Sequence, residues 1–141
     1  HWRGIDKQHG NNTSPLLVGP QGYRKSTFCR ILLPPELRFG YTDSIDFKSK
    51  QEAERSLGRF FLINIDEFDQ INANQQGFLK HLLQKPVANL RKPYGTTIQE
   101  MRRYASFIGT SNLKDLLTDP SGSRRFICIE VTGPTHKPWM P

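Results

Sequence analysis

The sequence predicts an α/β fold in which a parallel sheet is flanked by helices, and three observations carry this prediction. Short apolar runs typical of buried strands alternate with segments of helical periodicity, as they do in parallel sheets with crossover helices. The run closed by Asp66 is apolar almost throughout, as expected for a central strand covered on both faces. A glycine-containing turn joins the first apolar run to the first helical segment. With 141 residues, the chain is long enough for one domain with its own core.

Ten elements are expected along the chain, and Pro and Gly mark several of their ends. Pro34 and Pro86 stop the helices that precede them, and Gly58 is expected just past the last turn of another. The elements are, in order, a strand at 15–18, a helix at 26–33, an edge strand near 40–45, a helix at 51–57, a strand at 59–66, a helix ending at 85, a hairpin within 87–101, a strand at 104–109, a short helix at 113–117 and a strand at 125–131.

These elements place one core domain at 15–131, between an N-terminal segment at 1–14 and a Pro-rich tail at 132–141. The chain starts with His rather than Met, so we expect it to be a piece of a longer protein. Lys and Arg number 20 against 13 Asp and Glu, and the resulting net charge of +7 suits a partner rich in phosphate.

Membrane and export functions are not expected. No apolar run approaches the roughly 20 residues that a membrane-spanning helix needs, and no secretory leader is visible. Cys29 and Cys128 match neither a metal-ligand spacing nor a disulfide framework. We therefore expect a cytoplasmic protein without a membrane partner.

The turn between the first strand and the first helix has the context of a phosphate-binding loop. Backbone N–H groups of such a turn converge on an anion, Lys25 would reach the terminal phosphates, and the Ser26 hydroxyl would bind Mg²⁺. Compared with G-x-x-x-x-G-K-[ST], Arg24 replaces the second glycine, and its Cβ restricts the backbone. The alternative is an ordinary Gly/Pro turn before a cationic helix start. The expected nucleotide-binding residues are Gly19, Pro20, Gln21, Gly22, Tyr23, Arg24, Lys25, Ser26 and Thr27.

An acidic pair, Asp66 and Glu67, closes the central apolar strand. Asp66 would hold Mg²⁺ together with Ser26, and Glu67 would polarise the attacking water in phosphoryl transfer. The alternative is that these carboxylates, with Asp69, only stabilise the start of the following helix.

Two later sequence motifs lie at the ends of strands in the same predicted sheet. Asn112 follows the strand at 104–109 and would orient a water near the terminal phosphate, although Thr-Ser-Asn is also a common helix N-cap. Arg124 and Arg125 come directly before the last strand, where an arginine could neutralise charge in the transition state. Solvated surface arginines are the alternative.

The predicted hairpin is the candidate surface for nucleic acid. Arg91, Lys92, Arg102 and Arg103 would contact phosphates, and Tyr94 would stack on a base. The alternative is a solvated hairpin with Tyr94 packed on the core.

Five motifs in this order resemble those of the virulence-associated E family, whose members are P-loop ATPases related to the AAA+ and superfamily-three helicases of phage and plasmid replication. The resemblance covers roughly 16–131. The motifs are the glycine loop with Lys-Ser-Thr-Phe, Asp-Glu-Phe after the central strand, Arg-Lys-Pro-Tyr-Gly in the hairpin, Phe-Ile-Gly-Thr-Ser-Asn, and Gly-Ser-Arg-Arg-Phe.

This resemblance implies a P-loop NTPase core of the AAA+ type that uses ATP and Mg²⁺. It implies a Walker A motif at 19–27, a Walker B motif at Asp66 and Glu67, a sensor at Asn112, and an arginine finger at Arg124 or Arg125. It also implies a DNA-binding hairpin before the sensor strand and a parent protein that assembles into a homo-oligomeric ring, whereas the present chain would be a monomer.

Three functions follow as expectations. The first is the ATP-hydrolysing core of a DNA replication protein from a mobile element or phage. The second is a degenerate P-loop module that binds DNA or a protein partner without turnover, which the replacement of glycine by Arg24 favours. A small-molecule kinase is a weaker third expectation, because no acceptor-pocket motif is visible.

Overall fold

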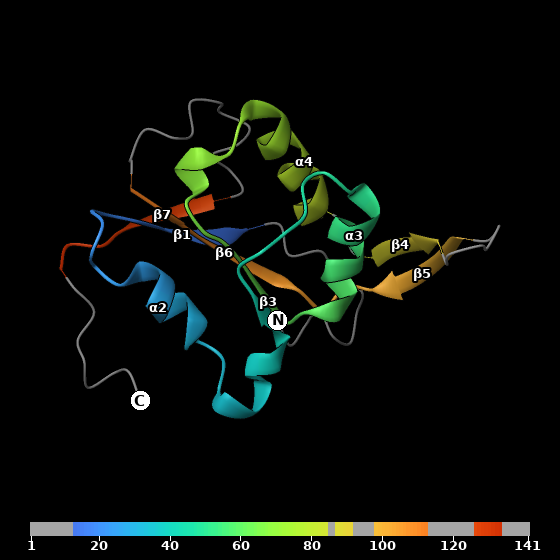
Figure 1. The fold of residues 1–141 in the computed structure, drawn as a ribbon, viewed down its shortest axis with the longest axis horizontal. Helices are drawn as coiled ribbons and strands as arrows, with labels where there is room; N and C mark the ends of the chain where they lie inside the picture. The colour runs from blue at the N-terminus through green and yellow to red at the C-terminus, as the bar shows by residue number, and fades with distance from the viewer. Residues whose placement is uncertain (1–12, 85–86, 92–97, 113–125, 134–141) are drawn as a thin grey trace.

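The computed structural model describes residues 13–84, 87–91, 98–112 and 126–133 (Figure 1). Its central layer is a five-stranded sheet in the order β2-β3-β6-β1-β7, and every pair of neighbours in it is parallel. The strands are β1 (Ser14–Val18), β2 (Tyr41–Thr42), β3 (Leu62–Ile65), β6 (Ser106–Ser111) and β7 (Phe126–Glu130). The predicted α/β class with a parallel sheet is confirmed.

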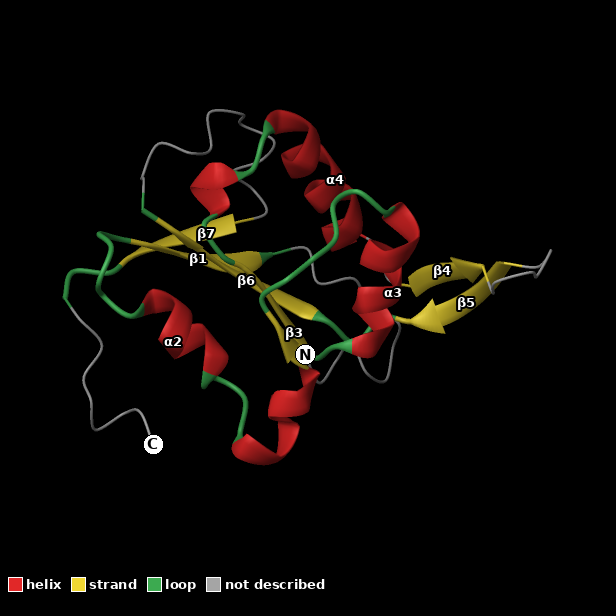
Figure 2. Cartoon of the chain, viewed as in Figure 1, coloured by secondary structure: helices red, strands yellow, loops and turns green. Residues whose placement is uncertain are grey.

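Helices cover both faces of this sheet (Figure 2). Leu16 and Val18 of β1 point into the larger core, which also contains buried residues of α3 and α4, whereas Leu17 points to the opposite face and packs with Cys29 of α2. This alternation is the period of two expected of a strand covered on both sides. The helices are α2 (Lys25–Arg30), α3 (Lys50–Arg59) and α4 (Ala73–Gln84), with 3₁₀ turns η1 (Pro35–Gly40) and η2 (Phe68–Gln70).

Two helix ends differ from the prediction. Helix α2 ends at Arg30 instead of 33. Pro34 has no N–H to donate to the carbonyl of Arg30, so the helical hydrogen bonds cannot continue through Leu33. Helix α3 continues through Gly58 to Arg59, so Gly58 does not end it. Ala53 and Leu57 lie four residues apart on one face of this helix and are both fully buried, and their burial outweighs the weak helix propensity of a single glycine.

A separate antiparallel hairpin connects α4 to β6, as predicted. It consists of β4 (Val87–Arg91) and β5 (Ile98–Arg102), with Val87 opposite Arg102 and Arg91 opposite Ile98. Strand β4 lies beside α3, and the hairpin extends away from the sheet (Figure 1). The edge strand expected near 40–45 is β2, which is only two residues long. The predicted helix at 113–117 lies outside the described residues, as do most of the segments at 1–14 and 132–141.

Candidate functional site

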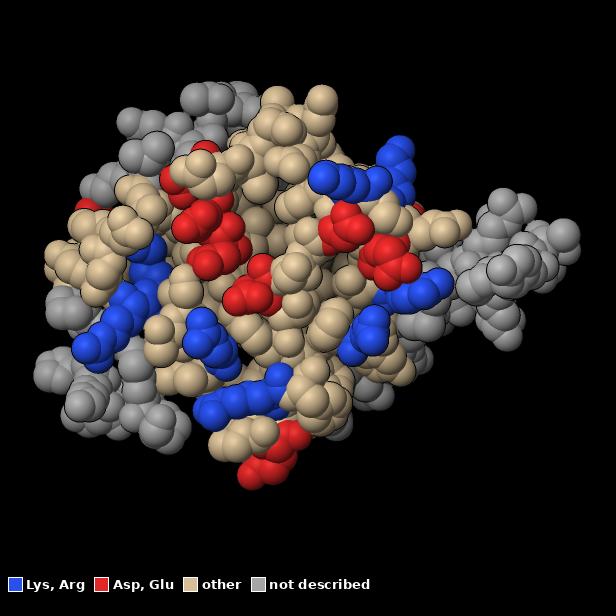
Figure 3. Space-filling view, viewed as in Figure 1, with Lys and Arg blue, Asp and Glu red and all other residues tan. Residues whose placement is uncertain are grey.

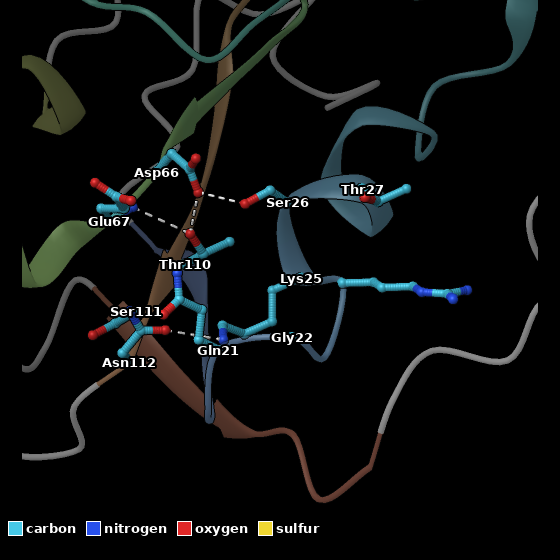
Figure 4. Close-up of a pocket in the computed structure, with 11 residues that line it drawn as sticks. Gln21, Gly22, Lys25, Ser26, Thr27, Asp66, Glu67, Thr110, Ser111 and Asn112 are labelled. Carbon is cyan, nitrogen blue, oxygen red and sulfur yellow. Dashed lines mark hydrogen bonds between the residues drawn. The ribbon is translucent and has the colours of Figure 1, made fainter.

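The carboxyl ends of β1, β3 and β6 meet at one edge of the sheet and surround a pocket of about 220 Å³ (Figure 4). The turn after β1 and the start of α2 form one wall, and the residues that follow β3 and end β6 form the other. The lining residues are Gln21, Gly22, Arg24, Lys25, Ser26, Thr27, Asp66, Glu67, Thr110, Ser111 and Asn112. Polar groups from three segments distant in the sequence therefore converge in one place.

The turn after β1 has an unusual backbone. Gly22 has φ 94°, and Arg24 lies in the left-handed region with φ 60° and ψ 34° directly before α2. Gly19 donates its N–H to Ser111 O at 3.1 Å, and a Cβ at Gly19 would lie 2.9 Å from Val131 O. Glycine is therefore needed at position 19, because the backbone of Val131 lies too close to leave room for a Cβ atom. Arg24 adopts the conformation that glycine takes most easily, at the position where the phosphate-loop motif has glycine.

Lys25 reaches back across this turn and is 8% exposed. Its Nζ donates to Gly19 O at 2.7 Å and to Pro20 O at 2.9 Å. It also donates to Asn112 Oδ1 at 3.3 Å (Figure 4). Burial lowers the pKa of Lys25 from its ordinary value, and the nearby carboxylates of Asp66 and Asp69 partly offset that effect. An ammonium has three N–H donors, so all three are engaged. An anion can be bound at Nζ only by replacing one of these partners.

Asp66 is held by two hydroxyl groups from different elements. Its Oδ1 accepts hydrogen bonds from Ser26 Oγ at 2.7 Å and from Thr110 Oγ1. Thr110 Oγ1 in turn accepts the N–H of Glu67 at 3.3 Å, and Glu67 has a left-handed backbone with φ 52° and an exposed side chain. One buried threonine hydroxyl therefore links both members of the acidic pair.

The chemistry of these donors fits a hard divalent cation. Mg²⁺ is held by one or two carboxylate or hydroxyl oxygens and completes its octahedron with water and substrate phosphates. Ser26 Oγ and Asp66 Oδ1 supply such oxygens 2.7 Å apart. In the described part of the chain, no cluster of three or more His, Cys, Asp or Glu side chains forms a metal cage. Ser26 Oγ and Asp66 Oδ1 are therefore the oxygen atoms of the site that could hold such a cation.

Three residues that meet at the site were not predicted for it, namely Thr110, Ser111 and Asp69. Thr110 is 3% exposed and bridges the acidic pair. Asp69 Oδ1 accepts long hydrogen bonds from Asn112 N at 3.4 Å and Ser111 Oγ at 3.5 Å, and so fastens the end of β6 to η2. Thr110 and Asp69 each lie two positions from a predicted residue in the sequence, but only the pairing of β3 with β6 shows what they contact.

Nine of the residues predicted for the nucleotide site line this pocket: Gln21, Gly22, Arg24, Lys25, Ser26, Thr27, Asp66, Glu67 and Asn112. Of the nine loop residues, Gly19 and Pro20 offer carbonyl oxygens to Lys25, whereas Tyr23 is half-buried in the turn and is not among the lining residues. Lys92, Tyr94, Arg124 and Arg125 lie outside the described residues.

The predicted DNA contacts in the hairpin are at different positions along it. Arg91 is the last residue of β4, at the end away from α4, and Arg102 is paired with Val87 where the hairpin joins the body. Among the described residues, basic and acidic side chains are interspersed on the face shown in Figure 3, so these residues do not form one basic surface there.

The prediction that Arg103 contacts DNA phosphates is wrong, because its side chain is only 2% exposed. The guanidinium donates to Ala105 O at 3.0 Å, Leu83 O at 2.6 Å and Leu82 O at 3.3 Å, and lies 5.4 Å from the ring centre of Phe107. Burial lowers the pKa of Arg103 to about 10. The last carbonyls of a helix lack partners within it, and Arg103 satisfies two of them at the end of α4. It is a structural residue at the base of the hairpin.

No helix in the described ranges combines the length and the hydropathy that crossing a bilayer requires.

Solved structures and family models place the chain among known proteins. Two apo structures of the C-terminal region of NrS-1 are similar, one with TM-score 0.64 at 17% identity and the other with TM-score 0.63 at 16% identity. Each match covers 94% of this chain, but only 31% and 33% of the solved chains, so the chain spans about a third of their length. At this identity the likeness concerns the fold.

None of the curated proteins matches the chain. The model of the virulence-associated protein E-like domain matches residues 6–141, which is nearly the whole chain. Three of the motifs that resemble this family also contribute residues to the pocket, namely the glycine loop, Asp-Glu-Phe and Phe-Ile-Gly-Thr-Ser-Asn. The chain therefore belongs to the virulence-associated protein E-like family.

Proposed function

We propose that this domain binds ATP with Mg²⁺ in the pocket at the carboxyl edge of β1, β3 and β6, and hydrolyses it. The observation that carries the proposal is the convergence of Lys25, the Ser26–Asp66 pair and Asn112 around one polar pocket. Phosphoryl transfer needs positioning and charge more than covalent chemistry, and these groups supply both.

Lys25 is the group that would recognise the terminal phosphates. Its bond to Asn112 Oδ1 is the longest of the three at 3.3 Å, so we expect a phosphate oxygen to replace that partner. The two shorter bonds to Gly19 and Pro20 would keep the ammonium at the loop. Release from Lys25 would free the Asn112 amide oxygen to accept a hydrogen bond from the attacking water.

Ser26 and Asp66 would hold Mg²⁺, which when bound neutralises the phosphate charge and orients the terminal phosphate. Glu67 lies beside Asp66 with an exposed side chain and would accept a proton from water as that water attacks the terminal phosphorus. The new bond joins the water oxygen to phosphorus, and the bond from phosphorus to the bridging oxygen of ADP breaks. Arg124 or Arg125 of a neighbouring subunit remains the expected source of further positive charge.

Membership of the virulence-associated protein E-like family supports a role in the replication of a mobile element. Within that role, we propose that DNA is the second partner and contacts the hairpin through Arg91, Lys92, Tyr94 and Arg102. The parent protein is proposed to act as a homo-oligomeric ring, in which one subunit completes the site of the next.

The test is calorimetric titration with Mg²⁺-ATP and Mg²⁺-ADP, together with phosphate release measured over a range of protein concentrations. Lys25→Ala should weaken binding by about 10- to 150-fold, because a hydrogen bond to a charged group contributes about 1.5–3 kcal/mol. Lys48→Ala removes the same charge from an exposed loop and should bind like the unmodified protein.

Glu67→Gln separates binding from turnover. It should retain nucleotide and lose about 10²- to 10⁴-fold in turnover, because the amide cannot accept the proton. Undiminished affinity in a folded Lys25→Ala protein would refute the phosphate site. Tight binding with no turnover at any protein concentration would favour the alternative of a module that binds without hydrolysis.

A further inference from the structure

A second cavity, of about 230 Å³, adjoins the polar pocket at Lys25. It is lined by Leu17, Lys25, Phe28, Val131 and Gly133. Lys25 is the residue that lines both cavities. The first cavity is surrounded by hydroxyl, carboxylate and amide groups, whereas three of the five residues of the second contribute apolar side chains.

Two parts of the fold form the walls of this cavity: the core between the sheet and α2, and the chain that follows β7. Leu17 and Phe28 pack in the smaller core between the sheet and α2. The chain that leaves β7 forms the opposite wall, where Val131 donates its N–H to Val18 O at 2.7 Å. The same residue approaches Gly19 so closely that a Cβ there would lie 2.9 Å from Val131 O. The wall is therefore fastened to the proposed phosphate loop.

We propose that this cavity receives the base of the nucleotide whose phosphates bind in the polar pocket, a proposal that rests on the function proposed above. A nucleotide has a charged end and a flat base with apolar faces, and the two adjoining cavities have the matching characters. Ligand sites commonly combine an apolar lining with a few polar groups that fix orientation. Phe28 supplies the aromatic ring against which the base packs.

The lining also determines how strongly bases are distinguished. Apolar walls recognise shape and discriminate weakly between ligands that differ only in polar groups. Leu17, Phe28 and Val131 present no side-chain hydrogen-bonding group. We therefore expect the affinities for ATP and GTP to lie within about tenfold of each other, because the cavity hardly distinguishes the polar groups by which the two purines differ.

The experiment compares Mg²⁺-ATP with Mg²⁺-tripolyphosphate, which has the phosphates without the base. Phe28→Ala should weaken ATP binding by about 5- to 150-fold, the range that follows when stacking on an aromatic ring is lost. Its affinity for tripolyphosphate should stay within about twofold of that of the unmodified protein. Phe39→Ala is the matched control, because that ring is 76% exposed on η1 and lines neither cavity.

A second variant protects the test from a folding defect in Phe28→Ala. Gly133 lines the cavity, and a Cβ there would meet no atom of the described residues within 4 Å, so Gly133→Phe adds a bulky side chain at the cavity wall without a clash at its Cβ. It should likewise lose ATP affinity and keep tripolyphosphate affinity. Equal losses for the two ligands, or no loss for either in a folded variant, would overturn the base site.

The unmodified protein separates the two proposals. If it binds neither ligand, the nucleotide function itself fails. If it binds tripolyphosphate as tightly as ATP, the polar pocket stands and the base site alone is wrong.

Discussion

Replacing Arg24 with glycine should stabilise the protein. Arg24 has φ 60° and ψ 34°, and an L-residue in this left-handed region costs about 1–2 kcal/mol. Glycine avoids that cost but loses about 0.5–1 kcal/mol through its greater freedom in the unfolded chain. The difference predicts a gain of about 0.5–1 kcal/mol for Arg24→Gly, which corresponds to a rise in Tm of about 2–4 °C for a domain of this size.

Two further variants distinguish the effect of backbone strain on stability from the effect of the Arg24 charge. Arg24→Ala removes the guanidinium and keeps the Cβ, so the strain remains and we expect a Tm within about 1 °C of the unmodified protein. The Arg24 side chain is exposed and forms no hydrogen bond or ion pair with the residues that the structure describes, so its removal should cost little. Gly22→Ala should destabilise by about 1–2 kcal/mol, because φ 94° strains any residue with a Cβ even in open space.

The assay is thermal and urea unfolding followed by circular dichroism, with the urea m-value checked for constancy. Equal stabilisation by Arg24→Gly and Arg24→Ala would show that charge, and not backbone strain, determines the effect. A lower Tm for Arg24→Gly would refute the argument altogether.

Two more predictions concern buried groups. Thr110→Val should destabilise the protein by about 1–3 kcal/mol, because Asp66 loses a hydrogen-bond donor and the Glu67 N–H loses its acceptor. Calorimetry should also show that ADP binding depends less on Mg²⁺ in this variant. Thr110→Ser keeps the hydroxyl group and should restore both the stability and the Mg²⁺ dependence. Burial raises the pKa of Cys29 to about 12, above its ordinary 9.0, so the unfolded chain releases this proton first and stability is lost as pH rises above 9. Urea unfolding should show a loss of about 1 kcal/mol between pH 9 and 10 that Cys29→Ala abolishes; a slope that survives this change would contradict it. At pH 8, a thiol reagent should modify exposed Cys128 at once and Cys29 only on unfolding.

The sequence by itself determined the order of the elements and the edge of the sheet at which the polar motifs gather. Apolar runs and helical spacing are local signals, and Asp66 and Asn112 each follow such a run. Once the strands are taken as parallel, their carboxyl ends must lie together, so the meeting of Lys25, Asp66 and Asn112 follows from chain direction alone.

Only the tertiary structure decided which polar groups are buried and what they contact. Arg103 has the sequence context of a surface arginine, yet the end of α4 places unpaired carbonyls around it. Thr110 becomes a bridge because β6 pairs with β3, more than 40 residues earlier in the chain. Phe28 and Val131 line one cavity although they are 103 positions apart in the sequence. Local patterns encode periodicity and turns, whereas the cost of burying a polar group depends on partners that only folding brings within reach.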